Sequence, residues 1–163
     1  LKIFTPMDIK HFLKSMAPVQ LLGFSTSSSG ATLPVTMKRC EKDLGISEEI
    51  SSFVLPLGAT INMDGTALYQ GVAAVFIAQA VGMDLTLANQ FTIVATAVLA
   101  SIGTAAVPGA GIIMLIIILE AINVPSEGIA LILGVDRILD MIRTATNVTG
   151  DATVASVMDS LER

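Results

Sequence analysis

Five polar side chains in the last third of the sequence recur at the spacing of one face of a helix. They stand at offsets of 0, 4, 7, 11 and 15 residues, and they are Asp136, Asp140, Arg143, Asn147 and Asp151. Residues at such offsets lie one above another along a helix. Apolar residues fill most of the positions between them. A soluble helix would turn this polar stripe toward water, but the composition of the chain indicates a different solvent.

Three members of the stripe together suit an amino acid. The guanidinium of Arg143 is planar and permanently charged, and its fork matches a carboxylate. Asp140 only accepts hydrogen bonds when it is ionised, so it suits an ammonium group. Asn147, one turn further along, can both donate and accept. A second carboxylate could use the positive ends of half-helices, so this set predicts a site for an acidic amino acid.

A second group of residues offers oxygen atoms to a hard cation. Asp64 and Asp151 each have an asparagine nearby in sequence, Asn62 and Asn147. Unwound backbone around residues 58–62 would expose carbonyl oxygens beside them. Carboxylates joined by several carbonyls suit a hard cation, and we interpret the group as a sodium site, with H+ as the alternative.

The composition favours a lipid bilayer over water. The chain has 163 residues, of which 53% are hydrophobic and 14% charged, and its mean hydropathy is +0.77, whereas soluble domains are about 25% charged. The net charge of −5 argues against a nucleic-acid partner. The single Cys40 and single His11 exclude an intrachain disulfide, a cysteine cluster for zinc and a catalytic triad. A charge facing lipid costs roughly 3 kcal/mol on insertion scales, so we expect most of the stripe to face protein or a wet cavity.

The elements that must position these residues are interrupted helices. Residues 15–37 and 85–119 carry no charge, yet their centres are rich in Ser, Thr, Gly and Pro, which break helices. A span needs about 20 residues, so the uncharged stretch 85–119 is too long for one span and too short for two. We predict a re-entrant hairpin in each stretch. Residues 50–83 would make a helix of about 50 Å, too long for a core of about 30 Å, unless it breaks at Asn62–Thr66.

A hairpin followed by a long helix occurs twice, and the two units enter from opposite faces. We therefore predict an all-α, multi-pass membrane protein built as an inverted repeat of two re-entrant helical hairpins and two long transmembrane helices, one of them broken. Such repeats mark the binding site of secondary transporters. The predicted boundaries are 7–45 for hairpin 1, 48–83 for the broken helix, 85–123 for hairpin 2 and 126–160 for the final helix. Lys and Arg gather at the ends of hairpin 1, which the positive-inside rule places on the cytoplasmic side.

These pieces resemble the glutamate/aspartate transporter family, the dicarboxylate/amino acid:cation symporters. The matching motifs are residues 27–34, 62–66, 101–111 and 140–151. The resemblance implies that residues 1–163 are a core transport domain whose N-terminal scaffold helices are absent, and that the full-length protein is a homotrimer. It also implies sodium-coupled symport of L-aspartate or L-glutamate by an elevator-type motion through the lipid bilayer of the inner or plasma membrane.

The resemblance also carries over individual binding residues. Arg143 matches the residue that holds the side-chain carboxylate, and Asp140 the residue that holds the amino group. The implied substrate contacts are Ser27, Ser29, Thr66, Val107, Gly111, Asp140, Arg143, Thr144 and Asn147. The implied sodium contacts are Gly58, Asn62, Asn147 and Asp151 at one site, Thr60, Met63, Ser101, Ile102 and Thr104 at a second, and Asn62 and Asp64 at a third. Some members carry a further arginine at the position of Ser27 or of Met141, and this chain has neither.

Three other interpretations fit parts of the pattern. Asp140 and Arg143, three residues apart, could form a purely structural ion pair. A C4-dicarboxylate symporter is the nearest alternative function, although a substrate without an amine would leave Asp140 unpaired. A remote alternative is an intramembrane aspartyl protease in which Asp64 and Asp140 share a proton. Because Arg143 would hold Asp140 ionised, we expect a transporter and not an enzyme.

Overall fold

The computed structural model describes residues 1–162, and the described chain is built from α-helices joined by short turns. This confirms the predicted all-α class. The elements in chain order are α1 (Ile9–Thr26), α2 (Ser29–Asp43), α3 (Glu48–Ile61), α4 (Asp64–Ala80), α5 (Leu87–Ile102), α6 (Ala110–Ala121), the 3-10 turn η1 (Ser126–Ile129) and α7 (Ala130–Glu162).

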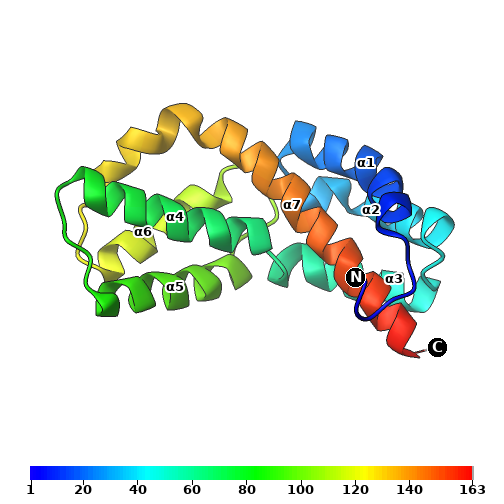
Figure 1. Cartoon of the computed structure of the whole chain (residues 1–163). Helices are drawn as coiled ribbons and strands as arrows, with labels where there is room; N and C mark the ends of the chain where they lie inside the picture. The colour runs from blue at the N-terminus through cyan, green and yellow to red at the C-terminus, as the bar shows by residue number, and fades with distance from the viewer. Residues whose placement is uncertain (163) are drawn as a thin grey trace.

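The long helix α7 joins two halves of the molecule, as Figure 1 shows. Helices α1, α2 and α3 pack around its C-terminal part, and α4, α6 and η1 contact its N-terminal part, with α5 packed on α4 and α6. Each half has its own hydrophobic core. One core includes Leu55 and Val148, and the other includes Ile77 and Ile132. The polar stripe of α7 therefore begins in one half and ends in the other.

Two short connections, which we call tip 1 (residues 27–30) and tip 2 (residues 103–111), join neighbouring helices. Tip 1 links α1 to α2, which lie side by side, and tip 2 links α5 to α6 in the same way. Ser27 ends α1 with a φ of 52°. Ser28 then caps α2, because its hydroxyl accepts a hydrogen bond from the amide of Ala31 at 3.1 Å. Gly109 begins α6 with a φ of 78°, a conformation that favours glycine.

The helices α3 and α4 are the two parts of an interrupted helix. Asn62 and Met63 have ψ angles of 66° and 61°, far from the helical value of about −42°. The interruption lies inside the interval 62–66 in which the sequence predicts a break, but α4 already resumes at Asp64. The final helix also differs slightly from its predicted start at 126, because one 3-10 turn precedes α7.

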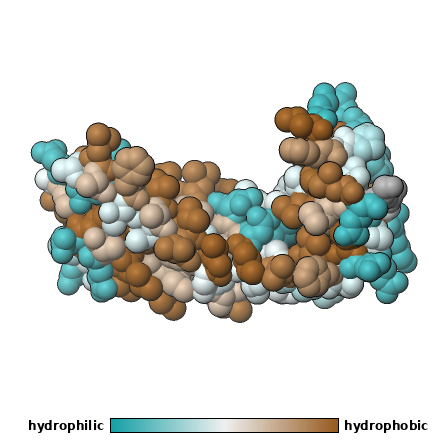
Figure 2. Space-filling model, turned by 90° about the horizontal axis from the view of Figure 1, so that it is seen from below, coloured by the Kyte–Doolittle hydropathy of each residue, from teal (hydrophilic) through white to brown (hydrophobic). Residues whose placement is uncertain are grey.

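Apolar side chains cover much of the surface. Figure 2 shows them across most of one face, with hydrophilic residues at both ends and in a patch near the middle. The most exposed apolar side chains include Leu68, Val72, Phe91 and Leu99, each more than half exposed.

Within residues 1–162, no helix is at once long enough and apolar enough to meet the criteria for a membrane span.

Candidate functional site

A small cavity lies where tip 1, tip 2, α4 and α7 meet, between the two cores. Its volume is about 20 Å³, which is room for roughly one water molecule. All nine residues predicted to bind substrate line it. The remaining lining residues are Met63, Thr104, Ala105 and Ala106.

The two central charges of the site contact each other. Nη2 of Arg143 donates to Oδ1 of Asp140 at 2.6 Å, and both side chains are buried. The other carboxylate oxygen, Oδ2, accepts a hydrogen bond from the amide of Gly109 in tip 2 at 3.0 Å. Each carboxylate oxygen of Asp140 therefore has one partner, and the two partners lie on opposite sides. The structure thus shows the ion pair that the three-residue spacing allows, and it ties this pair to tip 2.

The guanidinium of Arg143 is held on one face and left open at one nitrogen. Its Cζ lies 4.3 Å from the centre of the Tyr69 ring, a distance at which a cation is attracted to an aromatic face. The Tyr69 hydroxyl donates to Oδ1 of the buried Asp136 at 2.6 Å. A Cβ atom at Gly111 would overlap the guanidinium, so the absence of a side chain there makes room for it. Nη1 of Arg143 is buried without a hydrogen-bond partner.

Asn147 ties α7 to the start of α4. Its Oδ1 accepts from the amide of Gly65 at 2.8 Å, and its Nδ2 donates to the hydroxyl of Thr66 at 3.1 Å. Both partners lie in the first turn after the interruption between α3 and α4, where backbone amides lack partners within the helix. The side chain of Asn147 therefore supplies a hydrogen-bond acceptor to an amide that the break leaves without a partner in the helix.

The two tips contact each other over the cavity. The hydroxyl of Ser28 donates to the carbonyl oxygen of Ala106 at 2.6 Å, and the amide of Gly30 reaches the same oxygen at 3.4 Å. The neighbouring Ser27 is 2% exposed, and its hydroxyl has no hydrogen-bond partner. Tip 1 thus closes on tip 2 while it leaves one hydroxyl free at the cavity.

Three members of the first predicted cation group, Gly58, Asn62 and Asp151, are brought together about two turns from Arg143 along α7, whereas the fourth, Asn147, contacts Gly65 and Thr66. Nδ2 of Asn62 donates to Oδ1 of the buried Asp151 at 3.0 Å. A Cβ atom at Gly58 would lie 2.7 Å from the same oxygen, so α3 approaches the carboxylate closely. Asp64 is close by, since a Cβ at Gly150 would lie 2.8 Å from its Oδ2. Asp64 is exposed to solvent, which differs from the expectation that such charges face protein.

The second predicted cation group is only partly assembled. Ser101 and Thr104 are buried near tip 2, but their hydroxyls donate to backbone carbonyls of α5 at 2.8 Å and 2.7 Å. Thr60 is exposed and donates to the carbonyl of Leu57. Ile102 is 45% exposed. Met63 is buried at the interruption between α3 and α4, where it also lines the small cavity.

Sequence reasoning missed two residues of α4 that border the site. Tyr69 supports Arg143, and Gln70 is fully buried, with Nε2 3.5 Å from the carbonyl of Gly111 and Oε1 without a partner. For Tyr69 a signal was available, because it is the single tyrosine of the chain. It also stands three residues after Thr66, on the same helix face.

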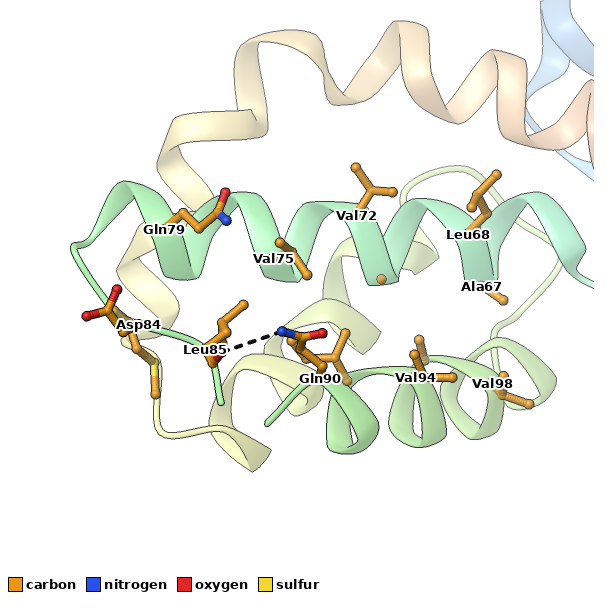
Figure 3. Close-up of a pocket in the computed structure, with 14 residues that line it drawn as sticks. Ala67, Leu68, Val72, Val75, Gln79, Asp84, Leu85, Gln90, Val94 and Val98 are labelled. Atoms are coloured by element: carbon orange, nitrogen blue, oxygen red, sulfur yellow. Dashed lines mark hydrogen bonds between the residues drawn. The ribbon is translucent and has the colours of Figure 1, made fainter. Parts of the chain in front are cut away.

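A much larger cavity lies elsewhere and has a different character. It has a volume of about 920 Å³ between α4 and α5 and is lined mainly by apolar side chains, among them Leu68, Val72, Val94 and Val98 (Figure 3). Its polar members include Gln90, whose amide is 3.5 Å from the carbonyl of Leu85. None of the residues predicted to bind substrate or cation lines it. Size alone would therefore select a cavity that holds none of the predicted site residues.

The comparison with known families excludes one interpretation of this geometry. The model of the sodium:dicarboxylate symporter family matches residues 1–161. The chain belongs to this family. Because its members are transporters, the protease interpretation is wrong. The geometry agrees, since Asp140 is held by Arg143, and Asp64 lies beside Gly150, ten residues or about 15 Å further along α7.

Relatives within the family include proteins from animals and bacteria. The chain is 49% identical over 153 residues to "Excitatory amino acid transporter 3" of Mus musculus. The aligned residues make up 94% of this chain and 29% of that protein. It is 49% identical over 156 residues to "Proton/sodium-glutamate symport protein" of Bacillus subtilis, which covers 96% of this chain and 36% of that protein. The chain thus spans about a third of the length of these relatives.

Proposed function

We propose that this chain is the core transport domain of a cation-coupled symporter for L-aspartate or L-glutamate. The observation that carries the proposal is the cavity between the tips, which collects all nine predicted substrate residues around a buried guanidinium. The free Nη1 of Arg143 is the decisive group. A buried charged donor without an acceptor is costly, and a substrate carboxylate is the acceptor that its fork matches.

Substrate binding then exchanges one ion pair for two. The side-chain carboxylate of the substrate takes Arg143, and its ammonium takes the carboxylate of Asp140. Breaking a buried pair from one side leaves an uncompensated charge and is strongly unfavourable. An acidic amino acid brings both opposite charges, so neither buried residue is left alone.

The small volume requires that a tip moves before substrate enters. A cavity of about 20 Å³ is much smaller than an amino acid. The two shortest contacts that hold tip 2 join Gly109 to Asp140 and Ala106 to Ser28, and longer ones come from Gly30 and Gln70. An ammonium group that takes Asp140 would compete with the first of these contacts. Tip 2 is therefore the segment that we expect to open and to close again over the bound substrate.

The coupled cation is assigned to the group around Asp151. Asn62 and Gly58 bring an amide and the backbone of α3 against this carboxylate, and the names of the family and of the bacterial relative include sodium. Sodium is the proposed cation, with the proton as the alternative. Asn147 lies one turn of α7 from Asp151 and also lines the cavity, so one helix carries both sites.

The arrangement of helices supports the wider proposal for the full-length protein. Each half pairs a helical hairpin with part of a long helix, in keeping with an inverted repeat of re-entrant hairpins. The domain would move in the lipid bilayer of the inner or plasma membrane, by an elevator motion against scaffold helices that lie in the rest of the protein. A homotrimer is the proposed assembly.

Binding measurements on the purified full-length protein test this proposal. Aspartate and glutamate are titrated by calorimetry with sodium and with choline in its place, and we expect tight binding only with sodium. The C4-dicarboxylate alternative gains from one observation, because the amide of Gly109 keeps Asp140 partnered without any substrate amine. Succinate is therefore the critical competitor. If succinate displaces aspartate at equal concentration, the proposed substrate is wrong.

A further inference from the structure

Four exposed lysines lie at one end of the α1–α2 pair. Lys10 and Lys14 are one turn apart on α1, and Lys38 and Lys42 are one turn apart on α2. The two helices contact each other. Nε2 of His11 lies 2.8 Å from the carbonyl oxygen of Asp43, so the start of α1 stands beside the end of α2. The four ammonium groups are thus at the same end of the pair, far from the tips.

Along each helix, the exposed residues between the lysines and the tip carry no charge. On α1 the positions after Lys14 on the exposed face include Ala17 and Leu21, and Leu21 is 68% exposed. On α2 the exposed residue one turn before Lys38 is Pro34. At 1.5 Å per residue, the step from Lys14 to Leu21 is about 10 Å. Charged residues followed by uncharged ones match a lipid, whose charged headgroup is followed by apolar acyl chains.

The acidic residues nearest to these lysines in sequence are engaged by other groups. Asp8 caps α1 by accepting from the amide of His11 at 3.0 Å. Asp43 pairs with Arg39 at 2.7 Å, and Glu41 accepts from the hydroxyl of Ser51 at 2.6 Å. The two ion pairs in the described residues 1–162 involve arginine, and neither includes a lysine. The lysine ammonium groups are therefore available to an external anion.

Two exposed apolar side chains precede this basic end. Ile3 is 89% exposed and Phe4 is 58% exposed, and Lys2 stands next to them. Exposed apolar side chains beside lysines are typical of segments that rest in the interfacial region of a bilayer.

We propose that this basic end, formed by Lys10, Lys14, Lys38 and Lys42, binds the headgroups of anionic phospholipids in the cytoplasmic leaflet. The inference rests on the membrane location of the proposed function, but not on its substrate. The lysines attract the phosphates, and the apolar residues nearer the tips contact the acyl chains. A lysine near an anionic bilayer surface contributes roughly a fivefold gain in affinity.

The test compares a charge-removing variant with a charge-keeping one in the purified full-length protein. The variant Lys10→Gln, Lys14→Gln, Lys38→Gln, Lys42→Gln and its matched control with Lys→Arg at the same positions are titrated with phosphatidylglycerol in neutral detergent. Native mass spectrometry counts the bound lipid. We expect the glutamine variant to bind phosphatidylglycerol at least tenfold more weakly, and the arginine variant to bind it as the unchanged protein does. Phosphatidylcholine should bind weakly to all three.

Three outcomes would overturn the inference. The first is phosphatidylglycerol binding by the glutamine variant within twofold of the unchanged protein. The second is equal binding of phosphatidylcholine, and the third is displacement of the lipid by an equal concentration of inorganic phosphate, which would indicate a site for soluble anions. Aspartate binding in detergent, measured in parallel, should be unchanged in both variants. Lysine-dependent lipid binding without any aspartate binding would refute the proposed substrate and leave this inference standing.

Discussion

Replacing Arg143 by threonine removes the one permanent cation of the cavity and tests its role most directly. Arg143 is 4% exposed, pairs with Asp140 at 2.6 Å and has one free nitrogen. A hydrogen bond to a charged group contributes about 1.5–3 kcal/mol, so a bidentate contact with the substrate is worth roughly twice that. Part of this gain is spent in breaking the contact with Asp140. We therefore expect a net loss of about 3 kcal/mol, or roughly a hundredfold weaker aspartate binding.

The same variant should bind small neutral amino acids more tightly. In the unchanged protein, a neutral substrate that takes Asp140 leaves the guanidinium of Arg143 buried and unpaired, which is unfavourable. That penalty disappears with threonine, so serine or alanine should gain affinity. The conservative Arg143→Lys keeps the charge without the planar fork and should fall between the two.

Calorimetry at saturating sodium measures these affinities. The double variant Asp140→Asn, Arg143→Thr controls for the carboxylate that the single variant leaves with only the amide of Gly109. Its thermal unfolding shows whether a loss of binding reflects a loss of fold. An aspartate dissociation constant for Arg143→Thr within threefold of the unchanged value would refute the assignment.

Substitutions at three further positions test the cation group, the support of Arg143 and the closure of tip 2. Asp151→Asn should lower the apparent affinity for sodium at least tenfold with the fold intact, and equal sodium dependence in titrations monitored by aspartate binding would contradict the cation assignment. Tyr69→Leu removes a cation–π contact worth about 0.5–2 kcal/mol, so aspartate binding should weaken roughly two- to thirtyfold. Tyr69→Phe keeps the ring under Arg143 and should weaken aspartate binding less. The same calorimetry compares the two variants, and equal losses of affinity would contradict a role for the ring. Ser28→Ala removes the 2.6 Å contact with the carbonyl of Ala106, so tip 2 should open more often, measured as faster amide hydrogen exchange in residues 103–111 than in the unchanged protein. Unchanged exchange there would show that this contact does not hold the tip.

Much of the helical organisation follows from local rules. The break at residues 62–63 follows from the length of the apolar stretch 50–83 and the polar residues at its centre, and both tips follow from Ser, Thr, Gly and Pro inside uncharged stretches. The stripe on α7 follows from helical periodicity, and burial of its charges follows from the cost of placing them in lipid. These features depend on neighbours within a few residues, which is why the sequence predicts them.

The remaining features depend on contacts between distant segments. Tyr69 and Gln70 look like ordinary members of an apolar helix until α7 and α6 are placed against them. The three-residue spacing allows Asp140 to pair with Arg143, but only the packed structure shows that Gly109 takes the other oxygen. The exposure of Thr60 and Asp64 likewise depends on which helices pack beside them, and periodicity carries no information about that.

Because α7 is one continuous helix, it fixes the distance between the two proposed binding sites. Eight residues separate Arg143 from Asp151, which is about 12 Å along the axis, so their ligands cannot touch, and the separation is the same whichever ligand arrives first. Asn147 stands between them and holds the first turn of α4 by the amide of Gly65. If one ligand orders that turn of α4, the second ligand binds to a turn that is already ordered. For the proposed function, thermodynamic reciprocity requires equal factors in both directions: whatever sodium adds to the affinity for aspartate, aspartate must add to the affinity for sodium.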